Sequence, residues 1–240
     1  MKTTTNPSTA LMSKIFVAAL SLTFLLVGYG NINAQNATQN NFADRVEGVV
    51  LEDSNAIDLG LSVLWADRNV GAETPTDYGI YFAWGEIEPK RTYTWKNYKF
   101  CKNGNYYKLT KYCDDPFYGI VDNKDELDPE DDAAVQNFGE GWRMPTESEF
   151  SELIKNCDYK DGVFTSRING NKISFPIAGW ICDDGKPLLK GSIGYYWSST
   201  CYPVNLEYAL SCNFDDVRVG SYARTQRYYG LPVRAVRDKE

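Results

Sequence analysis

Thr146-Glu-Ser-Glu-Phe-Ser-Glu-Leu-Ile-Lys-Asn-Cys157 has the clearest helical pattern in the chain. Thr146 stands at an N-cap position and Glu149 stands three residues later, which is the spacing of a capping box. Apolar side chains then recur every three or four residues and so share one helical face: Phe150, Leu153, Ile154 and Cys157. We therefore predict one well-defined helix near 146–157, with this face buried against a core.

After this helix, the spacing of the apolar residues changes from a helical pattern to a strand-like pattern. Short runs rich in β-branched and aromatic residues follow, and Asn-Gly, Asp-Gly, Gly-Ser or Asp-Asp turns separate them. These runs are 162–168, 172–181, 194–199, 206–214, 217–222 and 228–236. Before the helix, 57–66 and 78–84 are further strand candidates. Few helices and many short strands predict an α+β fold with a mostly antiparallel, loop-rich sheet.

Acidic residues are concentrated in 122–132, just before an Ala-rich segment that ends at Gly139. This pattern predicts a short helix near 130–138, because carboxylates are favourable near the positive N-terminus of a helix and Gly often ends one. The alternative is a calcium site, since Ca²⁺ takes carboxylate oxygens. Its candidate ligands are Asp128, Asp131 and Asp132. Their spacing departs from that of the EF-hand loop, so we expect no bound cofactor.

The N-terminal segment has the pattern of an export signal. Lys14 precedes an apolar run at 15–29, and the small residue Ala34 follows it. The run is shorter than the ~20 residues that cross a bilayer, so we interpret 1–34 as a signal peptide, with the start at Met1 or Met12. We expect a flexible leader at 35–50, a single domain at 51–240 and no transmembrane segment after cleavage. The mature protein is then periplasmic, on the cell surface or extracellular.

The composition excludes several kinds of catalytic and metal site and disfavours one class of partner. The 240 residues include 25 basic and 32 acidic residues, for a formal charge of −7, and no histidine. Without histidine there is no Ser-His-Asp or Cys-His mechanism and no His-ligated metal. The acidic balance disfavours a nucleic-acid partner, which selects basic surfaces. We therefore expect a protein that is not an enzyme.

Six cysteines occur, at positions 101, 113, 157, 182, 201 and 212. An even number in an exported protein allows up to three disulfides. Chain proximity suggests Cys101–Cys113 and Cys201–Cys212, which leaves Cys157 to pair with Cys182. The alternative is that some of the six are buried as small hydrophobic residues.

Four segments, taken in order, resemble a known family. They begin Asp58-Leu-Gly-Leu-Ser, Gly141-Trp-Arg-Met-Pro, Gly194-Tyr-Tyr-Trp-Ser and Arg227-Tyr-Tyr-Gly-Leu. This order resembles the Fibrobacter succinogenes major paralogous domain and its relatives in Bacteroidetes, which are similar to the C-terminal domain of the Legionella collagen-like adhesin. The resemblance covers most of 57–237 and implies a C-type-lectin-like fold. In such folds the first and last strands pair, which would place 61–65 beside 232–236. The calcium-binding loop motifs of sugar lectins do not occur here.

A polar, aromatic stretch at 200–227 is the expected ligand face, because Tyr, Asn and Arg give rigid contact area with adaptable hydrogen bonds. Its candidate ligand-binding residues are Tyr202, Asn205, Tyr208, Asn213, Asp215, Arg218, Tyr222 and Arg224. The resemblance also implies ligands at this region. We therefore predict an adhesin-like recognition domain for a glycan or a cell-surface protein.

Three other interpretations stay open. Tyr-rich strands are common on ordinary β surfaces, and 200–227 is then no ligand face. The disulfide-capable, loop-rich fold with no assigned chemistry also fits a structural or assembly subunit of the cell envelope. A carboxylate-based hydrolase needs two acids across a cleft. Asp215 and Asp216 make a poor pair for that role, because adjacent residues of a strand point to opposite faces.

Overall fold

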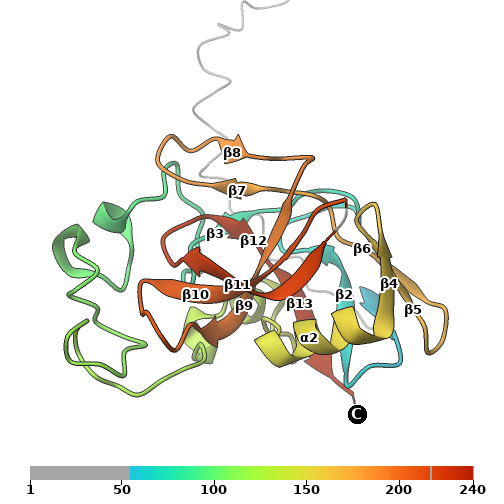
Figure 1. The fold of residues 1–240 in the computed structure, drawn as a ribbon, viewed down its shortest axis with the longest axis horizontal. Coiled ribbons are helices and arrows are strands. Elements are labelled where there is room, and N and C mark those ends of the chain that lie inside the picture. Colours follow the sequence, from blue (N-terminus) through green and yellow to red (C-terminus); the bar gives the residue numbers. More distant parts are fainter. Residues whose placement is uncertain (1–54, 217, 240) are drawn as a thin grey trace, which may run out of the picture. The chain divides into compact units, whose positions relative to one another are not determined.

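A computed structural model gives the structure of the protein and describes residues 55–216 and 218–239 (Figure 1). The chain divides after Asp44, and the unit formed by residues 45–240 contains every described element. The signal peptide predicted at 1–34 and the leader predicted at 35–50 lie outside the described residues. Across the described ranges, no helix is both long enough and apolar enough to cross a membrane.

Helix α2 (Glu147–Asn156) confirms the helix predicted near 146–157. Thr146 Oγ1 accepts from the Glu149 backbone N–H (3.2 Å), and the Glu149 carboxylate accepts from the Thr146 N–H (2.8 Å). Both bonds of the capping box are therefore present, and they satisfy donors that a helix leaves unpaired at its start. Phe150 and Leu153 are fully buried, as the apolar stripe predicts.

The short helix predicted near 130–138 is present in two pieces. A 3₁₀ turn, η4 (Pro129–Asp131), is followed by α1 (Ala133–Phe138), which ends at Gly139. Asp132 separates them, because it has an extended backbone and its carboxylate accepts from the N–H groups at the start of α1. The acid that the sequence placed at the helix N-terminus is thus its N-cap.

A three-stranded antiparallel sheet lies at the centre of Figure 1. It consists of β9 (Gly194–Cys201), β10 (Tyr208–Phe214) and β11 (Val219–Gln226), with β10 in the middle. The register shifts at a bulge on each side of β10. Because bulges increase local twist, they help this sheet to curve past α2, which lies beside β11.

A second sheet joins the two ends of the described chain. Its strands are β1 (Ala56–Ile57), β2 (Val63–Asn69) and β13 (Arg234–Asp238). β2 pairs antiparallel with β13, with Trp65 opposite Val236. The first and last strands therefore pair, as the family resemblance implied, but over 63–69 and 234–238 rather than 61–65 and 232–236, because Pro232 pairs with Tyr81 instead. Both Trp65 and Val236 are fully buried, so the register follows from their burial.

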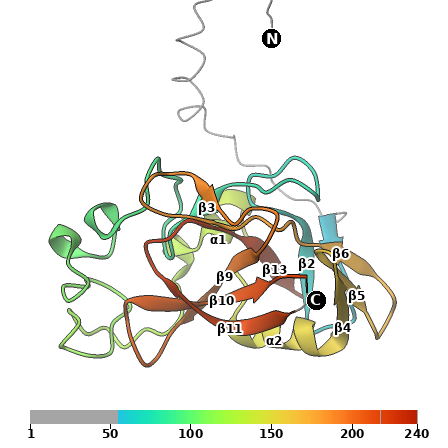
Figure 2. The ribbon, with the colours of Figure 1, turned by 45° about the horizontal axis from the view of Figure 1, so that its top comes forward.

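The remaining strands form small antiparallel sheets (Figure 2). One contains three strands, β4 (Cys157–Lys160), β5 (Val163–Ser166) and β6 (Lys172–Ser174). The second pairs β3 (Tyr81–Phe82) with β12 (Leu231–Pro232). The third pairs β7 (Trp180–Ile181) with β8 (Pro187–Leu188). Two 3₁₀ turns, η2 (Trp95–Asn97) and η3 (Lys102–Gly104), occur in the long connection between β3 and η4. All named strand pairs are antiparallel, so the described fold is α+β with mostly antiparallel sheets, as predicted.

Two aromatic clusters form most of the core. One surrounds Trp84 and Trp197, and the other packs α2 against β2 and the central sheet through Trp65, Phe175 and Phe214. Most of their rings meet edge-on or tilted, for example Trp65 and Phe150 with centroids 5.3 Å apart, whereas Tyr196 and Phe214 stack. Such pairs contribute about 0.5–1.5 kcal/mol beyond their buried area. The large aromatic content of the sequence is therefore mainly core.

The disulfide expectation is corrected by the structure, in which all six cysteines are free. Cys201 lies opposite Ala209 and packs near Trp84, whereas Cys212 lies opposite Tyr196 and packs in the cluster of α2. Proximity in the chain was therefore misleading for the Cys201–Cys212 pair. Cys101, Cys113, Cys157 and Cys182 are likewise unbridged. Four of the six are buried, and burial raises the pKa of Cys157 and Cys201 to about 11, so they behave as small hydrophobic residues.

Candidate functional site

Three of the predicted ligand residues come together on the central sheet. The ring centroids of Tyr202 and Tyr222 are 5.9 Å apart in an edge-on arrangement, and the Arg224 guanidinium lies 5.7 Å from the Tyr202 ring centroid. Tyr222 is 53% exposed and Arg224 is exposed, whereas Tyr202 is nearly buried. Tyr222 and Arg224 are both exposed because residues two apart on a strand, here β11, point to the same face.

The other predicted ligand residues have local structural roles. Asn205 Oδ1 accepts from the Glu207 N–H (2.9 Å) in the β9–β10 connection, and Asp215 Oδ1 accepts from the Arg218 N–H (2.8 Å) in the β10–β11 turn. Tyr208 pairs with Gln226 across the sheet, and Asn213 lies opposite both Gly220 and Tyr195. β10 separates the Asn205 turn from the Asp215 turn. These five residues therefore lie along the whole length of the hairpin.

A pocket of about 690 Å³ lies beside the Tyr202–Tyr222 pair. Its sheet wall comes from the strands and the β9–β10 connection: Thr200, Cys201, Pro203, Leu206, Leu210 and Tyr222. Its second wall is the start of α2, at Thr146, Glu147 and Ser148. Its third wall is the loop before η4: Asp114, Asn123, Lys124, Asp125 and Glu126. The volume falls within the range of small-ligand sites.

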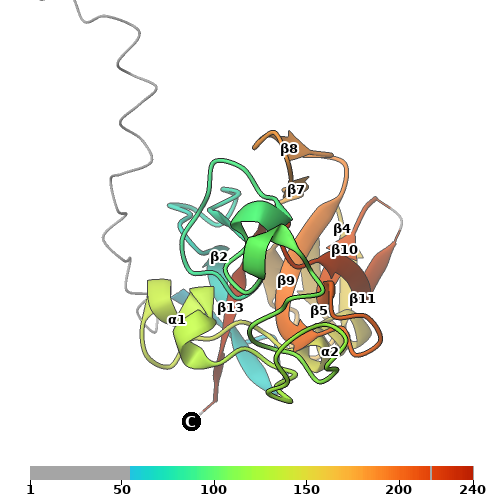
Figure 3. The same ribbon diagram turned by 90° about the vertical axis from the view of Figure 1, so that its left-hand side faces the viewer.

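Backbone hydrogen bonds hold the three walls of the pocket together. The Cys201 N–H donates to the Asp125 carbonyl (2.7 Å), and the Leu127 N–H donates to the Ser199 carbonyl (3.1 Å). The start of α2 is attached by the Ser199 N–H, which donates to the Pro145 carbonyl (2.8 Å), and by the Glu147 N–H, which donates to the side-chain Oγ1 of Thr200 (3.2 Å). Figure 3 shows the loop, in green, beside β9 and α2. The end of β9 thus positions both other walls.

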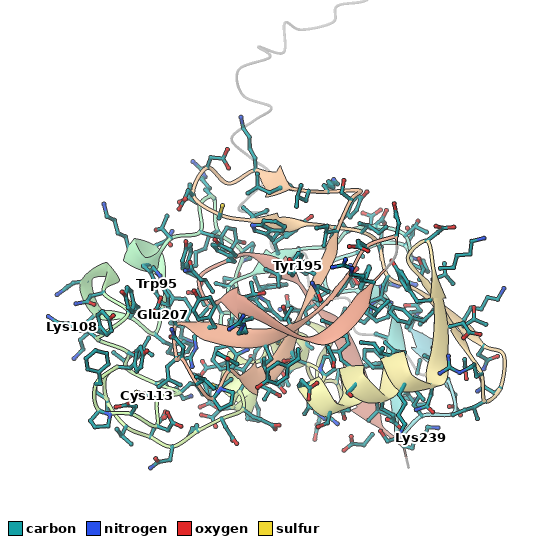
Figure 4. The ribbon with its side chains drawn as sticks, in the orientation of Figure 1. Trp95, Lys108, Cys113, Tyr195, Glu207 and Lys239 are labelled. Atoms are coloured by element: carbon teal, nitrogen blue, oxygen red, sulfur yellow. The ribbon has the colours of Figure 1, made fainter. Side chains whose placement is uncertain are left out.

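The loop also contacts the β9–β10 connection through side chains. Leu109, Cys113 and Leu206 form a small buried cluster. Figure 4 shows Cys113 of the loop and Glu207 of the connection on the same side of the molecule, away from Lys239. This packing fixes the loop that carries the acidic wall of the pocket.

The pocket is acidic. Four of its lining residues are carboxylates, Asp114, Asp125, Glu126 and Glu147, and one is a lysine, Lys124. Burial, together with the nearby Asp125 and Glu149 charges, raises the pKa of Glu126 above its usual value. Glu147 Oε1 accepts from Ser221 Oγ (2.8 Å), which orients that carboxylate from β11.

The candidate calcium residues do not form one group. Asp132 is taken up by the start of α1 and also accepts from the Met144 N–H (2.8 Å). Asp128 and Asp131 instead gather with Glu130, and oxygens of the three lie within 4.8 Å of one another. Lys111 Nζ lies 2.5 Å from Asp128, 3.2 Å from Glu130 and 2.5 Å from Asp131. We call these four residues the Lys111 cluster; a Ca²⁺ ion would have to displace its ammonium.

Sequence reasoning missed the structural role of one buried residue near the pocket, the arginine that begins the fourth motif segment. Arg227 is fully buried and donates to the Tyr112 carbonyl (3.0 Å) and to Cys201 Sγ (3.3 Å), with its guanidinium 4.8 Å from the Trp84 ring centroid. It thereby ties the loop to the end of β9 behind the pocket. An arginine within a run of polar strand residues reads as exposed, so only the packing reveals this role.

Comparisons of the chain with protein-family models, with curated proteins and with solved structures find no match.

Proposed function

We propose that this protein is an exported, non-enzymatic ligand-recognition domain of the adhesin type, which binds a glycan or a protein segment in the pocket between the central sheet, α2 and the acidic loop. The observation that carries the proposal is the half-exposed Tyr222 side chain on the sheet wall of this pocket. The exposed Arg224 extends the same surface beyond the pocket, and the buried Tyr202 packs edge-on against Tyr222.

The chemistry of the walls suits recognition. The Tyr222 ring offers an aromatic face for C–H groups or for a cation, and carboxylates and Thr200 offer acceptors for hydroxyl or ammonium donors. The walls are held by backbone hydrogen bonds, so the pocket is formed before a ligand arrives. Preorganised sites lose less entropy on binding.

We propose further that the fold is C-type-lectin-like. The pairing of β2 with β13 supports this, because it joins the first and last strands of the domain as the family resemblance implies. The four motif segments are the second support. The ligand pocket then lies next to the segment where the resemblance implies ligand contacts.

The test is binding of the mature protein to arrayed glycans and to surface-protein extracts, compared with Tyr222→Ala. We expect the variant to lose at least tenfold in affinity while its urea-unfolding midpoint stays unchanged, because Tyr222 is exposed. Arg218→Ala is the matched control, since Arg218 is exposed in the β10–β11 turn and does not line the pocket. Equal binding by Tyr222→Ala and the parent would place the ligand elsewhere and refute the proposed site.

A second candidate function, a carboxylate-based hydrolase, is favoured by one observation. Glu126 and Glu147 line the same pocket from different walls, and the pKa of Glu126 is raised by burial and by the adjacent carboxylates, as a general acid requires. Hydrolysis of a polysaccharide that Glu126→Gln abolishes would establish this function in place of simple binding.

A further inference from the structure

The carboxylates of the pocket have no ion-pair partner in the part of the chain that the structure describes, although the Arg143 charge acts on Glu126. Asp114, Asp125, Glu126 and Glu147 form no ion pair within the described residues. The cation that lines the pocket, Lys124, is directed to Asp128, which is not a lining residue (2.5 Å). Elsewhere in the fold carboxylates do have partners, as Glu149 has in Arg143 (2.6 Å). The charge of the pocket is therefore left for a ligand.

From this imbalance we infer that the ligand of the pocket is a protein segment that presents lysine side chains; the inference rests on the proposed function and names its ligand class. A concave surface with one sign of charge focuses its field and concentrates ions of the opposite sign. The Tyr222 ring on the pocket wall adds an attraction for an ammonium group.

A metal ion fits the pocket less well than an ammonium group. Ca²⁺ needs several oxygens at ~2.3–2.6 Å, so the ligand oxygens must converge. Within the described residues, three acidic side chains converge in this way only in the Lys111 cluster. The pocket carboxylates are instead divided between two walls, the loop and the start of α2. Dispersed charges suit a flexible organic cation.

The apolar part of the lining distinguishes a lysine side chain from an amino sugar. Pro203 is exposed on the sheet wall, and Leu206 and Leu210, which are more deeply placed, complete its apolar lining. A lysine stem has four methylene groups that pack on apolar surface while its ammonium reaches a carboxylate. An amino sugar would place ring hydroxyls against the same leucines. The lining therefore favours lysine, and a glycan ligand becomes an alternative outcome of the test.

The experiment is isothermal titration calorimetry of the mature protein with the peptide acetyl-Gly-Lys-Gly-Lys-Gly-amide and with the same peptide acetylated on both lysines. We expect the charged peptide to bind at least tenfold more tightly than the acetylated one, and its affinity to fall as NaCl is raised. Undetectable binding of the charged peptide, or equal binding of both, would overturn the inference.

The matched variants test the residues. Glu126→Gln/Glu147→Gln removes two charges from the pocket, and we expect at least a tenfold loss of affinity for the charged peptide. Glu73→Gln/Asp216→Asn removes two exposed charges outside the lining and is expected to leave binding unchanged. Urea-unfolding midpoints equal to the parent value show that the variants fold. Full binding by the pocket variant would refute the assignment.

A failure of this inference can be told apart from a failure of the proposed function. If a neutral glycan binds, with an affinity that Tyr222→Ala abolishes and Glu126→Gln/Glu147→Gln does not change, the pocket is a recognition site but its ligand is not cationic. If no ligand responds to Tyr222→Ala, the site itself is wrong.

Discussion

The Lys111 cluster and the pocket are both acidic, and both draw on the stretch 114–131, yet the fold treats their charges differently. In the Lys111 cluster, one lysine bridges three carboxylates, Lys99 donates to Asp131 (2.6 Å) and Tyr112 Oη donates to the same carboxylate (2.7 Å). In the pocket, four carboxylates share one lysine, and that lysine is paired outside the lining.

The carboxylates of the Lys111 cluster are paired within the fold and so stabilise it, whereas the carboxylates of the pocket are available to a ligand. Asp131 is almost fully buried, and a buried carboxylate is tolerated only when it is paired. Burial raises its pKa, but hydrogen bonds from Lys111, Lys99 and Tyr112 outweigh burial and hold the pKa below its usual value. Glu126 lines the pocket, and partial desolvation together with the Asp125 and Glu149 charges raises its pKa instead. The pKa shifts in the two regions therefore have opposite effects on how the free energy of unfolding depends on pH.

The largest expected effect comes from breaking the Lys111 cluster. Lys111→Met leaves Asp131 buried with Lys99 as its remaining cation, and we expect a loss of about 2 kcal/mol in the free energy of unfolding. Urea unfolding measures it. Lys186→Met, at an exposed lysine, is the control and should change stability by less than about 0.5 kcal/mol. Equal effects of the two substitutions would mean that the bridged carboxylates do not depend on Lys111.

The pH dependence of stability sharpens the comparison, because neighbouring acids in the chain shift in opposite directions. Burial raises the pKa of Asp132 to about 6, well above its unfolded value of 3.8. A raised folded pKa gives stability that is present at low pH and is lost as pH rises through about 6. Asp131 has a lowered pKa, so its contribution is present at neutral pH and is lost as pH falls below about 4.

We therefore expect the Asp132 group to add about 1 kcal/mol of stability between pH 7 and pH 5. Urea unfolding at each pH, for the parent and for Asp132→Asn, measures this term. The substitution removes the titrating carboxyl, so the gain on acidification should be smaller in the variant. A parent and a variant with the same dependence over pH 5–7 would contradict the raised pKa.

The smallest effect is expected at Lys124, where the two regions meet. The Lys124 side chain is exposed in its ion pair with Asp128. Because exposed ion pairs contribute little to stability, Lys124→Met should change the free energy of unfolding by less than about 0.5 kcal/mol. The pocket becomes more acidic, so affinity for the charged lysine peptide should rise by about two- to threefold. Calorimetry measures the change. Weaker binding would show that Lys124 itself contacts the ligand.

Local sequence patterns predicted the elements that depend on local interactions. Thr146 and Glu149 specify the start of α2 because their hydrogen bonds span three residues. The acids before α1 and the Gly139 at its end were equally readable. Of the expected ligand residues, Tyr202, Tyr222 and Arg224 lie together, whereas Asn205 and Asp215 form turns.

Contacts between residues that are distant in the sequence were not predicted from local patterns. The N-cap role of Asp132 agrees with the predicted acid at the start of the short helix, but its second bond, from the Met144 N–H twelve residues later, had no local signal. Glu126 and Glu147 were not singled out at all, because they are distant in sequence from each other and from Tyr222. The cysteines at 201 and 212 are close in the chain, yet they pack into different clusters.

The sequence by itself determined the α+β class, the capped helix and the absence of histidine chemistry, since these follow from composition and from contacts within a few residues. Only the tertiary structure decided which acids are neutralised and which line a pocket. The reason is physical: the effect of a charge depends on the groups within a few ångströms of it, and the fold brings those groups from Lys111, from the end of β9 and from the start of α2.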